Sequence, residues 1–395
     1  MSTERLKREV DGIAADEFAD RRAACAEQTK AMGLDALIVT SPSDLRYLVG
    51  YTGVSELGPN PFCAGPAAAL VVLSGGDAVL CAGEPDLSFG GAPVDSVGAL
   101  AIERFETFAG VEPLAPRMRL VEALGRALDG ARVVGFQPAS LPSNVQPLLA
   151  ESVREIAWRD AGEVVMTLRM RKSPAELALI RRAVAVCDAG QAAVAEIAGQ
   201  SETQGRLHAD LRAFIDRKAG RPVPCILEAS LGPPPEGVPD GRDRPVRASD
   251  LVLTDIAPRV GAYWGDSCNT QTLEPPTEEQ AAMLATVRDT LARATEAVRP
   301  GLRVSELDML MRDGIARGYP TFTGGGGHGI GLDFQESPRI VPTEKATLAS
   351  GMVIAMEPAI YLRDAAVRLE HVVAVTDDGC EVLSGHLRAG EGLAA

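Results

Sequence analysis

The sequence predicts an α+β protein of two domains, and three observations support this fold class. The chain has 395 residues, too many for one ordinary hydrophobic core and enough for two domains. Over residues 1–162, short apolar runs alternate with helix-like segments, which is typical of a small α/β domain. Over residues 163–395, long helical segments are accompanied by strand-like runs that contain isolated acidic residues. We therefore expect a scaffold domain followed by a larger domain that carries the chemistry.

Composition narrows the class of partner. Apolar residues make up 46% of the chain and charged residues 24%, as in soluble globular proteins. A net charge of −15 argues against nucleic acid and against an anionic membrane as partners. The start of the chain is charged and helix-like, and no apolar run reaches 18 residues, so we expect neither a secretory signal nor a membrane span. Seven scattered cysteines without CxxC spacing suit reduced thiols in a cytoplasm.

The first domain is predicted from alternating helix and strand signals, and none of its residues has a catalytic pattern. The predicted elements are a helix over 16–33, a buried strand over Ala36–Thr40, a turn and short glycine-ended helix over Ser41–Gly53, strand-like runs within 67–83 and 131–143, and a helix near Leu120–Leu128.

A long helix is predicted at the start of the second domain. The segment Met166–Gly199 begins as a basic linker and continues with an amphipathic pattern. Ser173 suits the N-cap, Pro174 the first helical position and Glu176 the third, which together form a capping box. We expect this helix to join the two domains.

The remaining elements of the second domain follow from caps and breakers. They are a helix over Glu202–Ala219, a loop over Leu231–Pro245, a hairpin of strands Leu251–Ile256 and Tyr263–Leu273 with its turn near Pro258–Gly261, a helix over Thr277–Val298, and a helix capped by Ser305 and Asp308 that ends near Arg317.

Two aspartates of the predicted hairpin are candidate metal ligands. Asp255 and Asp266 are eleven positions apart on strands expected to face each other. Two bare carboxylates side by side repel, and one takes up a proton unless a divalent cation lies between them. Burying Asp255 alone in its apolar strand carries a large free-energy cost. In the alternative interpretation Asp255 caps a turn and Asp266 faces solvent, and the pair alone does not decide between the two.

Three further residues stand in similar surroundings. His328 follows four consecutive glycines, which allow a close backbone approach. No Gly-Lys-Ser/Thr follows them, which argues against a phosphate loop, although a lone histidine is often only a structural hydrogen-bonding group. Glu357 and Glu370 each interrupt an apolar run, where a carboxylate is rarely buried unless it is paired or metal-bound. Together with Asp255 and Asp266 they form a ligand set suited to Mn²⁺, Fe²⁺, Co²⁺ or Zn²⁺.

The same residues carry a resemblance to a known family. The matching motifs are Asp255, Asp266 eleven residues later, His328-Gly329-Ile330-Gly331, Gly351-Met352 with Glu357-Pro358, and Arg368-Leu369-Glu370. In this order and spacing they resemble the creatinase/prolidase/methionine aminopeptidase family of pita-bread metallopeptidases (M24), in particular aminopeptidase P and prolidase. Segments 41–53 and 170–183 also resemble the N-terminal domain and interdomain helix of that family.

The resemblance implies a fold, a cofactor and roles. It implies a C-terminal pita-bread metallohydrolase domain after a creatinase-type domain that provides substrate access and oligomer contacts, in a homodimer. Asp266 and Glu370 would bridge two divalent ions, Mn²⁺ being expected first; Asp255 would bind one ion, and His328 with Glu357 the other. The ions would hold a bridging hydroxide, and Glu357 would collect its proton. The expected activity is that of an Xaa-Pro aminopeptidase or Xaa-Pro dipeptidase on a short peptide or amide.

The chain also departs from the family pattern. A histidine that the family carries in the loop before the first aspartate is missing near Val238 or Pro239, and Gln335 replaces a second one. Glutamine donates a hydrogen bond but carries no proton at neutral pH. The residues after Asp266 are Ser267-Cys268-Asn269-Thr270 rather than the usual arginine and threonine.

These departures leave two alternatives open. One is a metalloenzyme repurposed as a hydrolase, lyase or oxidative enzyme for a non-peptide small molecule. The other is a non-catalytic binding protein. We expect Glu357, Gln335 and Arg368 to be catalytic, and Tyr263, Asp333 and Gln335 to contact the substrate. Each of the substrate-facing candidates also has a structural alternative. Tyr263 could be a packed ring and Asp333 a loop cap. Gln335 could be a solvated amide and Arg368 a salt-bridged strand residue.

Overall fold

The chain divides into two compact units, Met1–Arg169 and Met170–Ala395, which are described separately below. The boundary expected after residue 162 stays a prediction. The computed structural model describes residues 9–52, 68–83, 87, 100–105, 115–143, 145–153, 155–232, 241–322 and 324–387. Among these residues, no helix combines the length and the apolar character that crossing a bilayer requires.

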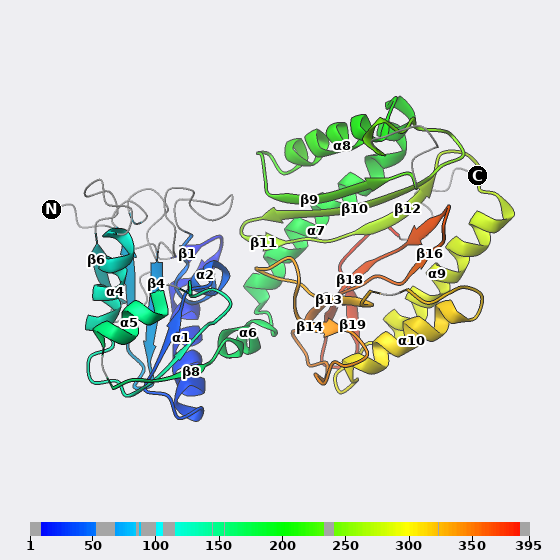
Figure 1. The fold of residues 1–395 in the computed structure, drawn as a ribbon. Helices are drawn as coiled ribbons and strands as arrows, with labels where there is room; N and C mark the ends of the chain where they lie inside the picture. The colour runs from blue at the N-terminus through cyan, green and yellow to red at the C-terminus, as the bar shows by residue number, and fades with distance from the viewer. Residues whose placement is uncertain are drawn as a thin grey trace. The chain divides into compact units, whose positions relative to one another are not determined.

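The first unit is built on a mixed sheet in the order β6-β5-β4-β3-β7-β8 (Figure 1). Its strands are β3 (Ala36–Val39), β4 (Ala68–Leu73), β5 (Ala78–Gly83), β6 (Ala101–Phe105), β7 (Val133–Phe136) and β8 (Ala157–Asp160). The small strands β1 (Glu9–Val10) and β2 (Ile13–Ala14) pair with each other, and the helices are α1 (Ala15–Ala31), α2 (Pro42–Val49), α4 (Ala115–Ala127), α5 (Val145–Ser152) and α6 (Glu163–Arg169). One core cluster packs α4 and α5 against the central strands.

Buried charges fix α1, α2 and α6 to one another. Arg21 and Arg22 of α1 donate to the backbone oxygens of Tyr47 and Leu48 at the end of α2. Arg169 forms a 2.7 Å ion pair with Asp44 of α2, and its side chain is only 2% exposed. The prediction that Met166 begins a basic linker is therefore wrong, because residues 166–169 are the last turn of α6 and their arginine is needed to balance a buried carboxylate.

The second unit contains two antiparallel sheets and a two-stranded ribbon. The first sheet comprises β9 (Cys225–Ser230), β10 (Leu251–Val260), β11 (Tyr263–Trp264) and β12 (Cys268–Thr272). The second has the order β14-β13-β15-β18-β19, with β13 (Gly327–Gly329), β14 (Glu336–Ile340), β15 (Val353–Met356), β18 (His371–Val375) and β19 (Cys380–Val382). The ribbon pairs β16 (Ala359–Tyr361) with β17 (Ala366–Arg368).

Helix pairs cover these sheets, as Figure 1 shows for the second unit. The helices α7 (Pro174–Gln200) and α8 (Gln204–Lys218) share a core with the first sheet. The helices α9 (Glu278–Ala297) and α10 (Val304–Ala316) share a core with the second sheet and the ribbon. The predicted capping box of α7 is confirmed, since Ser173 and Glu176 exchange both expected hydrogen bonds.

Several local predictions need correction. The strand β9 was not predicted at all. β10 runs on to Val260, and the turn lies at Gly261 and Ala262, which both have positive φ, of 60° and 69°. Residue 303 is the N-cap of α10 and makes no side-chain cap, so Ser305 and Asp308 lie inside the helix, where Asp308 pairs with Arg312. Part of the predicted 231–245 loop is a short 3-10 helix (Gly241–Asp243), and residues 233–240 lie outside the described residues.

A candidate metal centre

The predicted hairpin brings Asp255 and Asp266 together, although not on facing strands. Asp255 lies on β10 opposite Cys268 of β12, whereas Asp266 lies in the irregular segment between β11 and β12. That segment stays attached because Ile256 N–H donates to the Ser267 oxygen at 2.9 Å. One carboxylate oxygen of each aspartate, and one of Glu370, lie within 4.8 Å of one another.

Glu357 and Glu370 occupy breaks between strands, not the strands themselves. Glu357 follows β15, and its N–H donates to the Gly326 oxygen at 2.9 Å. Glu370 precedes β18, and its N–H donates to the Cys268 oxygen at 3.0 Å. These two backbone hydrogen bonds fix the positions from which the Glu357 and Glu370 side chains extend. These four carboxylates, together with His328, are called the acidic cluster below. Backbone hydrogen bonds between segments distant in sequence hold its parts together.

His328 completes the group, and its glycine neighbours explain how it fits. Gly327 has φ +143°, and a Cβ there would lie 2.0 Å from the Ala355 oxygen of β15. The His328 ring contacts the Gly329 oxygen through Nδ1 at 3.0 Å, which requires that Nδ1 carry the proton. Nε2 is then a bare acceptor, 3.4 Å from Asp266 Oδ2 and 3.8 Å from Glu357 Oε1. This is the tautomer that a metal ligand needs.

The pKa values of these five side chains are shifted by burial and by the neighbouring carboxylates. Burial, with neighbouring carboxylates adding to it, raises the pKa of Asp266 and of Glu370 well above their usual range. Burial raises the pKa of Asp255 and takes the pKa of Glu357 to about 7. Burial lowers the pKa of His328 to about 4, so this ring is neutral at pH 7.

Three buried carboxylate oxygens indicate whether divalent cations fit this site. Among the described residues, no hydrogen-bond partner reaches Asp255 Oδ1, Asp266 Oδ1 or Glu370 Oε1, although all three atoms are buried. Buried polar atoms are nearly always paired, so these oxygens indicate a missing partner. Carboxylates with one imidazole and no thiolate form a donor set for divalent cations such as Mn²⁺, Fe²⁺, Co²⁺ or Zn²⁺. The residues present fit such ions.

Arg368 contacts several side chains at the edge of this cluster. Its Nη2 lies 2.8 Å from both Asp255 Oδ2 and Glu228 Oε2. Nη1 donates to the Tyr361 hydroxyl at 2.8 Å, and Nε donates to the Cys268 sulfur at 3.0 Å. Arg368 therefore lies beside the acidic cluster, and its charge is shared among Asp255, Glu228 and, at 3.8 Å, Glu357.

The three residues predicted to contact the substrate, Tyr263, Asp333 and Gln335, differ in exposure and in hydrogen bonding. Tyr263 is 2% exposed, and its hydroxyl donates to Glu176 Oε1 at 2.7 Å, so the structure gives Tyr263 a packing role and no support as a substrate contact. Asp333 is half-buried, and its N–H points to Glu336 Oε2 at 3.5 Å. Gln335 is exposed in the same bend. Phe334 between them packs against His328, with ring centroids 5.4 Å apart.

Sequence reasoning missed Glu228 and the thiol of Cys268. Glu228 lies on the unpredicted strand β9, next to the partly buried Leu227 and the buried Ala229. An acid inside an apolar strand-like run was the signal that identified Glu357 and Glu370, and it applies to Glu228 as well. The expected histidine position near Val238 and Pro239 lies outside the described residues.

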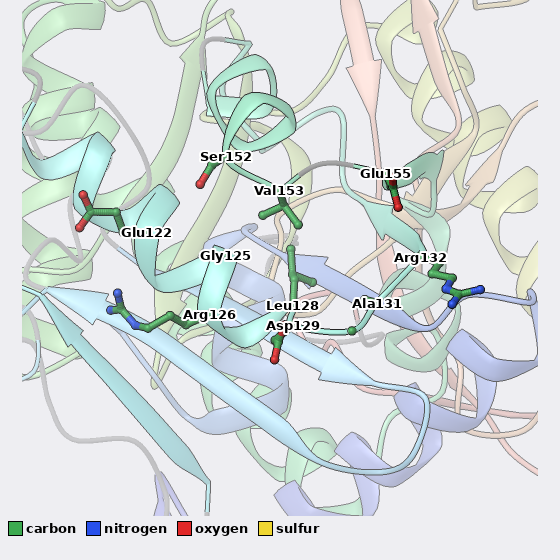
Figure 2. Close-up of a pocket in the computed structure, with 11 residues that line it drawn as sticks. Glu122, Gly125, Arg126, Leu128, Asp129, Ala131, Arg132, Ser152, Val153 and Glu155 are labelled. Carbon is green, nitrogen blue, oxygen red and sulfur yellow. The ribbon is translucent and has the colours of Figure 1, made fainter.

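A separate pocket occurs in the first unit. It has a volume of about 790 Å³ and is lined by residues of the α4 and α5 ends, among them Glu122, Arg126, Asp129 and Arg132 (Figure 2). Side chains of both charge signs line it, and none of the predicted site residues does. It therefore adds nothing to the acidic cluster.

Comparison with protein families gives two matches that together span most of the chain. Residues 178–377 match the family described as "Metallopeptidase family M24". Residues 21–171 match the "Creatinase/Prolidase N-terminal domain". The acidic cluster lies entirely within the first of these matches.

Individual relatives and solved structures agree. A "Probable dipeptidase PepE" of Mycobacterium tuberculosis is 28% identical over 372 residues, covering 92% of this chain and 94% of the relative. An "Xaa-Pro dipeptidase" of Pyrococcus furiosus is 27% identical over 362 residues, covering 89% and 93%. The structure of dipeptidase PepE from Mycobacterium ulcerans has a TM-score of 0.79 at 26% identity, covering 96% and 98%. The prolidase of Pyrococcus horikoshii has a TM-score of 0.74 at 21% identity, covering 94% and 99%, which shows the fold alone.

Proposed function

Because the chain belongs to metallopeptidase family M24, we propose that it is a metal-dependent hydrolase of the Xaa-Pro dipeptidase type that cleaves short peptides. The predicted family resemblance is confirmed, as is the fold class, an α+β chain with a creatinase-type domain followed by a pita-bread domain. The observation that supports the activity best is the cluster of five side chains with three buried oxygens left without partners in the described part of the chain.

We propose that this cluster holds two divalent ions, Mn²⁺ being the first choice. Asp266 and Glu370 would bind both ions, Asp255 one of them, and His328 with Glu357 the other. Oxygen donors with one imidazole suit Mn²⁺, and the neutral state of His328 at pH 7 removes competition from a proton. When bound, the ions would polarise the substrate carbonyl and make water a nucleophile near neutral pH.

The chain's own residues supply positioning and proton transfer. Glu357 is 20% exposed, and its raised pKa of about 7 makes its carboxylate a suitable proton acceptor at neutral pH. Its Oε2 lies 3.8 Å from Arg368 Nε, and this positive charge keeps burial from raising the pKa of Glu357 further. Gln335 would donate a hydrogen bond from the exposed bend but would not relay a proton. We therefore expect slower turnover than in an enzyme that carries a histidine there.

Three further properties belong to this proposal. A cytoplasmic location is supported by the cysteines, since the six in the described part of the chain are all free thiols. A homodimer, with the first unit providing oligomer contacts and substrate access, is carried over from the family resemblance. The negative charge of −15 supports a small-molecule or short-peptide substrate rather than nucleic acid.

The test combines metal analysis with a substrate panel. The purified protein is analysed for bound metal and assayed with Mn²⁺ on Xaa-Pro dipeptides and on matched Xaa-Ala dipeptides. We expect about two ions per chain and preferential cleavage of the Xaa-Pro series. Asp266→Asn and Glu370→Gln should each lose metal and turnover, while the control Asp289→Asn, at an exposed position on α9, should keep both. Full metal content with no hydrolysis of any dipeptide would refute the peptidase assignment and favour a repurposed metalloenzyme.

A further inference from the structure

Glu228 lies next to the five-residue cluster without belonging to it. It stands on β9 directly opposite Asp255 of β10, so both side chains project from the same face of the sheet. Arg368 Nη2 is 2.8 Å from an oxygen of each. A single guanidinium therefore separates Glu228 from a proposed metal ligand.

The two carboxylates differ in how far they reach solvent. The side chain of Asp255 is 17% exposed and that of Glu228 48% exposed. Arg368 holds Oε2 of Glu228, and within the described residues Oε1 accepts no hydrogen bond. Carboxylates opposite each other on paired strands repel, so Arg368 is needed to keep them in place. Glu228 is thus an oriented acceptor with a half-exposed side chain beside the cluster.

Exposed apolar side chains flank this acceptor. Ile226 lies two residues earlier on the same face of β9 and is 46% exposed. Tyr361 of β16 is also 46% exposed, and its hydroxyl is bound to the same Arg368. Large exposed apolar side chains are few: in the described part of the chain they are Met32, Met118, Ile226, Met309 and Tyr361. Two of these five are next to Glu228, which indicates a place for an apolar group of a ligand.

We propose that Glu228 determines specificity by binding the free ammonium group of the substrate's N-terminal residue, while Ile226 and Tyr361 contact that residue's apolar side chain. This inference rests on the proposed peptidase function. An ammonium donates up to three hydrogen bonds and is recognised by a carboxylate acceptor that is already oriented. The arrangement would select peptides with an unblocked amino end and an apolar first residue, and would place that end along β9.

The experiment compares two probes that differ only in the ammonium group. L-leucinamide carries it, and 4-methylpentanamide has hydrogen in its place. Binding of each to the Mn²⁺-loaded full chain is measured by titration calorimetry for the natural protein, for Glu228→Gln and for the control Glu381→Gln. Glu381 is a matched control because it lies on β19, is 51% exposed and pairs with Arg181 at 2.6 Å. Metal content is determined for every sample.

We expect the natural protein to bind leucinamide more tightly than 4-methylpentanamide. Glu228→Gln should weaken leucinamide binding about five-fold and leave the uncharged probe unchanged, a size typical of a half-exposed charge contact. Glu381→Gln should match the natural protein.

Three results would overturn the inference. The first is that the natural protein binds both probes equally, or binds neither. The second is that Glu228→Gln loses metal, which would make Glu228 a support of the metal centre. The third is that Glu228→Gln binds leucinamide as tightly as the natural protein does. Hydrolysis of the Xaa-Pro and Xaa-Ala dipeptide panel is scored separately. Glu228-dependent leucinamide binding without hydrolysis would refute the proposed function and leave the recognition site standing, whereas hydrolysis without that dependence would do the reverse.

Discussion

Replacing Glu357 with glutamine should stabilise the metal-free protein at alkaline pH. The pKa of Glu357 rises from 4.5 to about 7 on folding, because burial and the nearby Asp255 charge disfavour its ionised form. An acid with a higher pKa in the folded state binds more protons when folded, so the stability of the fold decreases as pH rises between the two values. Glutamine resembles the protonated form and removes this dependence.

The magnitude follows from the two pKa values. The free energy of unfolding lost to ionisation of Glu357 is about 1 kcal/mol at pH 5 and about 3 kcal/mol at pH 8. The side chain is 20% exposed, so solvent screening reduces these figures only in part. Glu357→Gln should therefore gain about 2 kcal/mol more, relative to the natural protein, at pH 8 than at pH 5.

The assay is urea unfolding after exhaustive treatment with a chelator, at both pH values. Comparing two pH values removes any contribution of the amide that does not depend on ionisation. Glu296→Gln, at an exposed position of α9, provides the control and should differ from the natural protein by less than about 0.5 kcal/mol at either pH. A Glu357→Gln protein that is equally affected at pH 5 and pH 8, or is less stable at pH 8, would refute the reasoning.

Three further predictions concern other parts of the chain. Lys172→Met should lower the free energy of unfolding by about 3–5 kcal/mol, because the 2.5 Å Lys172–Glu336 pair is almost fully buried and the carboxylate would lose its paired cation; Lys172→Met/Glu336→Gln should recover much of this in urea titrations. Affinity for Mn²⁺ should increase as pH rises through about 7, where Glu357 loses its proton, and calorimetry in buffers of different ionisation enthalpy should show proton release. Burial raises the pKa of Cys25 and of Cys81 to about 12, so both thiols should resist iodoacetamide at pH 8 until urea unfolds the protein, as peptide mass mapping would show.

Signals that are local in sequence predicted the structure well. Ser173 and Glu176 form their capping box because every atom involved belongs to one helical turn. The short helix predicted within Ser41–Gly53 is present as α2 and ends at Val49, where Gly50 takes the left-handed conformation. Asp255, Glu357 and Glu370 were identified because each interrupts an apolar run, and such a residue needs a partner wherever the chain folds. Asp266 and His328 were identified by spacing and by the family motifs.

Other features depend on distant residues and left no local signal. The hydroxyl of Tyr263 is bound by Glu176, 87 positions away, so its packing role was not visible from its own neighbours. Asp266 has the spacing of a strand partner but lies in a break, because β11 ends after two residues. Strand β9 follows a proline, and its pairing partner β10 begins 21 positions after β9 ends. Glu228 was missed together with that strand.

The charges of the cluster connect stability to function. Asp255, Asp266, Glu357 and Glu370 carry four negative charges when ionised, which two divalent cations would balance. Arg368 and Glu228 then balance each other. Without the cations, burial raises the pKa of all four carboxyls, so each holds its proton to a higher pH than a solvent-exposed carboxyl does. Metal binding must therefore displace protons and stabilise the fold at the same time, and any variant that neutralises one carboxylate should exchange metal affinity for metal-free stability.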